Sequence, residues 1–78
     1  MDFREAFTSV MAARGYSQRA LADEVGTQQP NVARMLKRDA VPLDKVCDYL
    51  AAMGYQVAFV PVGTKLPDAC YVIGGEQR

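Results

Sequence analysis

Hydrophobic residues in the first part of the chain, up to Gly54, recur every three to four positions, the spacing of one face of an α-helix. The first run predicts a helix over Phe3 to Arg14 and is followed by Gly15, a common helix stop. Ser17 then offers a side-chain oxygen to the free amides of a second helix, which ends at Gly26. The pattern therefore predicts two short helices joined by a tight turn.

A third helix is predicted to begin at Thr27 or Gln28, either of which can stand at the cap, and to run to about Arg38. Pro30 falls in its first turn, where proline is tolerated because first-turn amides have no partner inside the helix. Residues 39–42 interrupt the pattern, and a fourth helix then restarts it with one apolar face. This face consists of Leu43, Val46, Cys47, Leu50 and Met53, and we expect it to be buried.

After Gly54 the apolar period changes to two or less. Residues 55–60 are rich in β-branched and aromatic side chains and stop at Pro61, which predicts a strand. A second apolar run, residues 69–73, follows a turn-rich stretch and is a candidate hairpin partner. The chain is thus divided into a helical part, residues 1–54, and a β element with a tail, residues 55–78.

The length of the chain, 78 residues, allows one small domain. Such a domain buries only about 60% of the surface of its unfolded chain, so it gains from a disulfide, a metal or a second copy. Cys47 and Cys70 stand far apart and there is no histidine, so we expect no zinc site, no other metal and no cofactor. Dimerisation is the remaining means of stabilisation.

Charge is segregated along the chain although the formal net charge is zero. Between Thr27 and Arg38 there are three cations and no acid, whereas five of the nine acids follow this stretch: Asp39, Asp44, Asp48, Asp68 and Glu76. An ordinary solvated helix face would explain the three cations equally well, so charge supports a nucleic-acid partner without establishing one.

The N-terminus lacks the basic region and apolar core of a signal peptide, and no apolar run approaches the roughly 20 residues that cross a bilayer. The expectation is a cytoplasmic protein with no membrane partner.

The span from Gln18 to Lys37 resembles the lambda-repressor-like helix-turn-helix of the Cro/CI, or XRE, family. That unit has glutamine first, a small residue fifth, glycine ninth, and apolar residues fourth, eighth, fifteenth and eighteenth. In these places the chain has Gln18, Ala22, Gly26, Leu21, Val25, Val32 and Met35. The chain departs from the pattern at Thr27, where the family usually has an aliphatic residue, and at Gln28, which replaces a capping serine. The resemblance implies a mainly α fold with four to five helices.

The same resemblance implies which side chains meet double-stranded DNA. Gln18 would bond a phosphate, and the start of the third helix would face the major groove, where glutamine or asparagine can pair with adenine and arginine with guanine. Lys37 and Arg38, one turn later, would meet phosphates, and Arg19 and Arg14 are weaker phosphate candidates. The expected DNA-binding set is Gln18, Arg19, Thr27, Gln28, Gln29, Asn31, Arg34, Lys37 and Arg38.

The C-terminal part resembles the ending of antitoxin regulators of the HigA and HipB type, in which a short β element pairs across a dimer. A lone strand is marginal in water, and an apolar strand edge invites pairing with another chain. The expected dimer-interface residues are Tyr55, Val57, Phe59, Val60 and Tyr71. Alternatively, residues 55–60 and 69–73 pair with each other and fold back on the first helix, with the dimer formed elsewhere. A four-stranded sheet in the dimer would combine both arrangements.

An enzyme is not expected, because the chain has no histidine, no glycine-rich phosphate loop and no serine or cysteine with a plausible base. The sequence instead favours a transcriptional regulator, a repressor, that binds an inverted-repeat operator as a homodimer. The alternative is an antitoxin or phage-type regulator that also binds and inhibits a protein partner.

Overall fold

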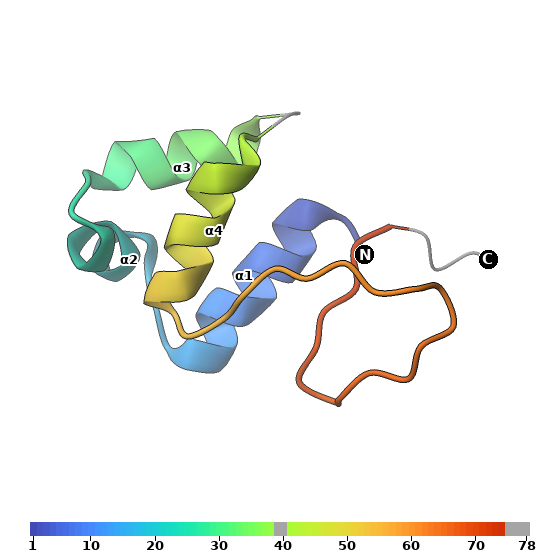
Figure 1. Ribbon diagram of the computed structural model, residues 1–78. Helices are drawn as coiled ribbons and strands as arrows, with labels where there is room; N and C mark the ends of the chain where they lie inside the picture. The colour runs from blue at the N-terminus through green and yellow to red at the C-terminus, as the bar shows by residue number, and fades with distance from the viewer. Residues whose placement is uncertain (39–40, 75–78) are drawn as a thin grey trace.

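A computed structural model describes residues 1–38 and 41–74, and its described part contains four α-helices (Figure 1). Their bounds are α1 Phe3–Arg14, α2 Gln18–Val25, α3 Gln29–Lys37 and α4 Leu43–Ala52. All four helices were predicted from the apolar spacing, with ends that agree to within one or two residues. Of the predicted interruption at 39–42, residues 39 and 40 lie outside the described residues, while Val41 and Pro42 are not helical.

Side chains next to the helix ends supply hydrogen bonds that the backbone lacks. Asp2 and Glu5 form a capping box at the start of α1, in which the Glu5 amide donates to Asp2 Oδ1 at 2.8 Å and the Asp2 amide donates to Glu5 Oε1 at 3.0 Å. Ser17 caps α2 as predicted, since its Oγ accepts from the amide of Ala20 at 3.0 Å. Gln28 is the residue at the cap of α3, but its side chain forms no capping hydrogen bond.

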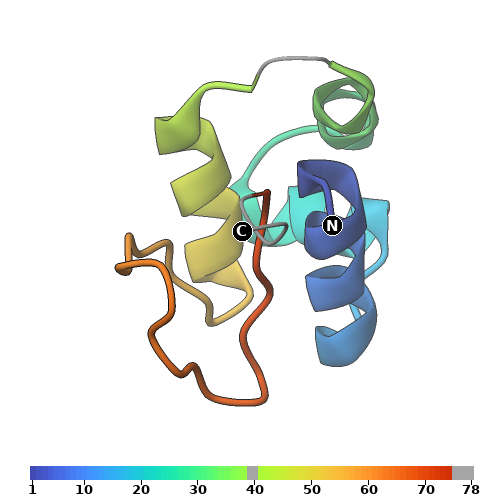
Figure 2. The same cartoon turned by 90° about the vertical axis from the view of Figure 1, so that its right-hand side faces the viewer.

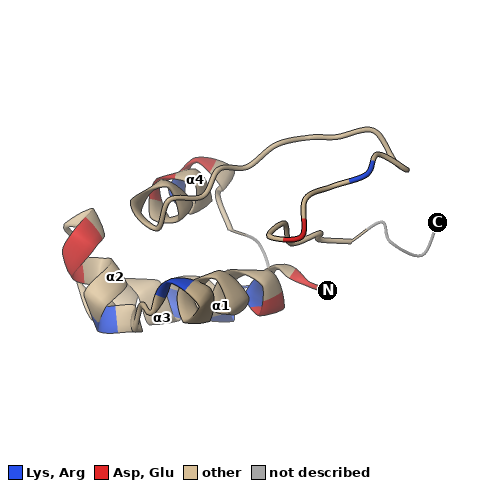
Figure 3. Ribbon diagram, turned by 90° about the horizontal axis from the view of Figure 1, so that it is seen from below, with Lys and Arg blue, Asp and Glu red and all other residues tan. Residues whose placement is uncertain are grey.

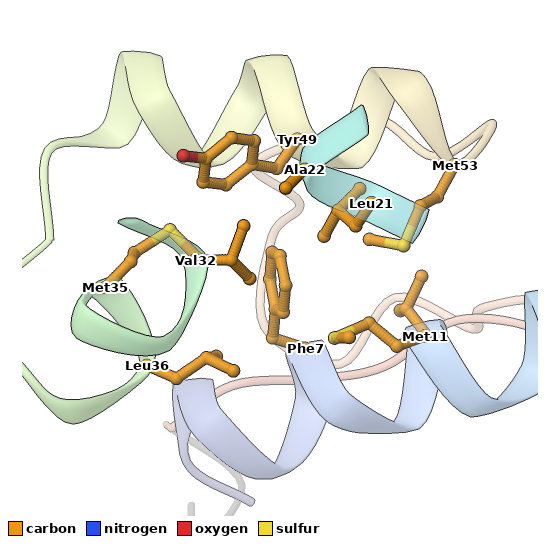
Figure 4. Packing of buried hydrophobic residues seen from close by; sticks show 10 residues of the cluster. Phe7, Met11, Leu21, Ala22, Val32, Met35, Leu36, Tyr49 and Met53 are labelled. Atoms are coloured by element: carbon orange, nitrogen blue, oxygen red, sulfur yellow. The ribbon is translucent and has the colours of Figure 1, made fainter. Parts of the chain in front are cut away.

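The hydrophobic core lies between the four helices and is centred on three side chains that are almost completely buried, Phe7, Leu21 and Val32 (Figure 4). Ala22 is 1% exposed, and α2 packs against both α3 and α4. A larger side chain at this position would therefore push the helices apart. The buried cluster consists of Phe7, Val10, Met11, Leu21, Ala22, Val32, Met35, Leu36, Tyr49 and Met53.

The predicted buried face of α4 was partly wrong. Val46 and Met53 are buried, but Leu43 is 52% exposed, and Cys47, expected to be buried, is only half-buried, as is Leu50. Tyr49 takes the central place, with its ring edge-on to Phe7 at 6.4 Å between centroids (Figure 4). Positions 46, 49 and 53 form one stripe of the helix, and the large apolar body of tyrosine fills the core better than a cysteine does.

The predicted C-terminal strand and hairpin are absent from the part of this single chain that the structure describes. After α4 the backbone leaves the helices, forms a wide loop and returns to the N-terminus (Figures 1 and 2), where the Gly74 amide donates to the Met1 carbonyl at 3.2 Å. Hydrogen bonds inside the loop close two turns, Thr64 to Pro61 and Cys70 to Pro67. A two-stranded hairpin is marginal in water unless a further strand or a helix packs against it, which explains why the side-chain pattern alone did not produce one.

No helix in the described ranges is both long enough and apolar enough to cross a membrane.

The packing at Ala22 leads to a stability prediction. We expect Ala22→Leu to lower the free energy of unfolding by about 1–3 kcal/mol, because the added atoms must displace packed neighbours. Ala20→Leu is the matched control, since Ala20 lies exposed on the same helix. Urea unfolding followed by circular dichroism measures both, and equal midpoints for the two variants would show that the α2 contact is not tight.

Candidate nucleic-acid interface

The turn between α2 and α3 fixes the angle at which α3 leaves the domain. Gly26 has a φ of 85°, a left-handed conformation that side-chain-bearing residues rarely adopt. The amides of Gly26 and Thr27 both donate to the carbonyl of Ala22, each at 2.9 Å. With Val32, Met35 and Leu36 of α3 buried in the core, the remaining sides of α3 face outward.

The structure brings the predicted DNA-binding residues together on the outside of α2, the turn and α3. Gln18 and Thr27 are half-buried at the edge of this surface, and the other members of the set are exposed. We call this surface the α3 polar face; it comprises Gln18, Arg19, Thr27, Gln28, Gln29, Asn31, Arg34, Lys37 and Arg38.

One hydrogen bond ties the starts of α2 and α3 together. Nε2 of Gln29 donates to Oε1 of Gln18 at 3.1 Å. This bond uses one of the two N–H groups of Gln29 and leaves its carbonyl oxygen and its second N–H. Those two remaining groups are the acceptor and donor that the edge of an adenine requires in the major groove.

A second set of hydrogen bonds runs along α3. Nδ2 of Asn31 donates to Oγ1 of Thr27 at 2.8 Å, and Nη1 of Arg34 donates to Oδ1 of Asn31 at 2.8 Å. Thr27 in the turn and Arg34, seven residues further along the chain, are thereby connected through the side-chain amide of Asn31.

Shallow grooves flank α3 on both sides, and each contains a cation that the sequence analysis missed. Between α3 and α4, Lys45 joins Arg34 and Arg38. Between α1 and α3, Arg4 joins Gln18 and Lys37 in the second groove. Nε of Arg4 also donates to the carbonyl of Leu36, which holds the guanidinium beside the end of α3.

The sequence offered only a weak signal for these two cations. Arg4 and Thr8 are one helical turn apart on α1 and both line the same groove. Nothing in the local pattern says that this face of α1 adjoins α3, or that the first turn of α4 adjoins Arg38. The charges gather only when the chain is folded.

Other candidates lie elsewhere. The Arg14 guanidinium lies 5.0 Å from the centre of the Tyr55 ring and packs against Gly54, so it stands at the far end of α4 and not on the α3 polar face. Asp23 and Glu24 lie at the opposite end of α2 from Arg19, as the red and blue positions of α2 in Figure 3 show. The two acids are thus separated from Arg19 by the length of α2.

The predicted dimer residues form much of an exposed apolar surface. Tyr55 is half-buried against the core cluster, and its ring lies 6.2 Å from that of Tyr71. Val57, Phe59 and Val60 are 39%, 90% and 48% exposed. This C-terminal apolar surface consists of Val57, Phe59, Val60, Val62, Tyr71, Val72 and Ile73.

A helix that is braced by a second helix through a glycine turn, and that presents polar side chains from its first turns, is the architecture of a helix-turn-helix DNA-binding domain. The family model described as a helix-turn-helix domain matches residues 3–60, which include all four helices, and the chain belongs to this family. No curated protein and no solved structure shows a significant match to the chain.

Proposed function

We propose that this protein is a sequence-specific transcriptional regulator that binds an inverted-repeat operator as a homodimer, with α3 in the major groove. The observation that carries the proposal is the α3 polar face, where Gln29 and Arg34 are exposed and already oriented by hydrogen bonds. Repression follows wherever the operator overlaps a promoter, because the bound dimer then excludes the polymerase.

Base recognition is assigned to the first turns of α3. Gln29 has the free donor and acceptor that adenine requires, Arg34 can donate to the two acceptors of guanine, and Gln28 lies beside them at the cap. Gln18 is then in a position to bond a phosphate while it orients Gln29.

Phosphate contacts are assigned to both flanks of α3. A helix in the major groove lies between two phosphate backbones, and the two grooves beside α3 both carry cations: Arg4 and Lys37 on one side, Arg38 and Lys45 on the other. Arg19, exposed at the start of α2, extends the first of these rows.

Dimerisation is assigned to the C-terminal apolar surface. Residues 55–60 have strand-forming side chains but no strand partner in the described part of the chain, and Phe59 is 90% exposed. Pairing of this segment with its copy in a second chain supplies the missing backbone partners and covers the apolar side chains. Residues 55–60 also fall within the family match.

A second function, inhibition of a protein partner by an antitoxin-type regulator, is favoured by one observation. The surface extends beyond the predicted strand to Val62, Val72 and Ile73, which are 81%, 48% and 55% exposed. Exposed apolar side chains outside the predicted strand are suited to contact with a further protein. Finding a toxin gene next to the gene for this chain would support this function.

Selection of bound sequences from random duplex DNA tests the main proposal directly. We expect an inverted repeat whose half-sites are about 34 Å apart, one helical turn of DNA. Recovery of sequences with no common motif would rule out a sequence-specific regulator.

Two substitutions on α3 test base recognition. We expect Gln29→Ala and Arg34→Ala each to lose about 1–3 kcal/mol of discrimination between operator and random DNA, because both side chains contact bases and neither is in the core. Thr64→Ala, in the exposed C-terminal loop, is the control. Gel-shift titrations give the ratio of affinities, and discrimination as strong as in the wild type would remove α3 from the interface.

Substitutions on the two flanks test the phosphate contacts. Lys37→Ala and Lys45→Ala should each weaken binding to all duplexes alike and lower the slope of log affinity against log salt by about one unit. Lys65→Ala removes the same charge from the C-terminal loop and should leave the slope unchanged. A slope that falls as much for Lys65→Ala as for the other two would mean that only net charge matters.

A proline substitution tests the dimer. Val57→Pro removes a backbone donor from the predicted intermolecular sheet and should shift sedimentation at micromolar concentration towards the monomer, with a matching loss of operator affinity. Lys65→Pro, in the exposed loop outside the C-terminal apolar surface, is the control. A wild-type monomer, or a Val57→Pro protein that stays a tight dimer, contradicts this interface.

A further inference from the structure

We propose that Thr27 and Asn31 are positioning residues, which hold Arg34 ready for a guanine that occurs in each half-site, and that Asn31 does not read a base itself. The inference rests on the proposed function, since it concerns how the α3 polar face selects its operator. It is carried by the hydrogen bonds that join these three side chains.

The direction of the hydrogen bonds is set by chemistry. A guanidinium can only donate, so the group of Asn31 that faces Arg34 must be its carbonyl oxygen, here 2.8 Å away. The amide nitrogen of Asn31 then points the other way, and Thr27 Oγ1, at 2.8 Å, accepts from it. An aliphatic residue at position 27 has no atom that can accept this hydrogen bond.

Thr27, at the start of this series of hydrogen bonds, is held in place by the fold. The Thr27 amide donates to the Ala22 carbonyl at 2.9 Å, and the Thr27 side chain is half-buried. The backbone of Asn31 is also held, because its backbone N–H donates to the backbone carbonyl of Gln28 at 2.9 Å. Arg34 is exposed, and a side chain with many rotamers gains most from being ordered before it binds.

The same hydrogen bonds remove Asn31 from base recognition. Adenine pairs with an amide through both its oxygen and an N–H group, and the Asn31 amide is held at both ends, its nitrogen by Thr27 and its oxygen by Arg34. Turning this amide towards an adenine would break these bonds. Arg34 donates one N–H group to Asn31, and its remaining N–H groups are available for the two acceptors of guanine.

A neutral amide also orients Arg34 without cancelling its charge. The other charged side chains that line this groove are Arg38 and Lys45, and no lining residue is an acid. An aspartate at position 31 would form a stronger bond to Arg34 but would reduce the positive charge that DNA requires.

The test combines substitutions with operators in which one base pair is changed. Thr27→Val removes the acceptor and keeps the shape, and we expect the preference for guanine over the other bases at the Arg34 position to fall about three- to tenfold. Thr27→Ser keeps a hydroxyl and should restore most of the preference. Asn31→Ala, an exposed position, should reduce the preference at the same base pair as Thr27→Val does.

A double-mutant cycle separates positioning from direct contact. If Thr27 acts through Arg34, Thr27→Val has no further effect on affinity or preference when Arg34 is already alanine. Additive effects of the two substitutions, or an Asn31→Ala variant that loses preference at a different base pair, overturn the proposal. Thermal melts of each variant confirm that the fold is retained.

The failure of this inference is distinguishable from the failure of the proposed function. A wild-type protein without any sequence preference overturns both. A wild-type protein that prefers guanine at this position, loses that preference in Arg34→Ala and keeps it in Thr27→Val and Asn31→Ala overturns only the positioning role.

Discussion

The packing of α2 against α3 and α4, with Ala22 buried in it, is the constraint on which the rest of the structure depends. The side chain of Ala22 is almost completely buried, and its carbonyl accepts two hydrogen bonds from the turn that follows. This one residue thus sets both the separation of the helices and the path of the chain between them. Because Leu21 and Val32 are buried on either side of the turn, α3 cannot rotate about its axis without exposing apolar surface.

Because the orientation of α3 about its own axis is fixed, the polar side chains on its outer surface are placed to form hydrogen bonds with one another. Gln29 lies within reach of Gln18, and Asn31 lies within reach of both Thr27 and Arg34. Polar side chains that are oriented in the free protein lose less conformational entropy on binding, so the surface is suited to selecting bases as well as to attracting phosphates.

The C-terminal segment differs from the helical part in that most of its apolar side chains are exposed. It contributes Tyr55 to the edge of the core but leaves Phe59 and Val62 in water. A small domain whose helices are already packed has no surface left to cover these side chains. In the proposed homodimer a second chain covers these side chains and places two copies of α3 on the same face of a duplex.

Local sequence determined the helices, because apolar spacing, Ser17 and the glycines act within a few residues of where they stand. It also located the α3 polar face, because the residues of the helix-turn-helix lie close together in the chain and their spacing sets which of them point outward.

Only the tertiary structure decided which face of α4 is buried, which cations lie beside α3 and whether residues 55–60 form a strand, because these features depend on which surfaces pack together. Tyr49, and not Cys47, is buried in the core, because this face of α4 packs against Phe7. Arg4 of α1 and Lys45 of α4 line the two grooves beside α3, although they belong to other helices. The strand at 55–60 was predicted from side chains alone, but a strand also needs a backbone partner, and the described part of a single chain does not supply one.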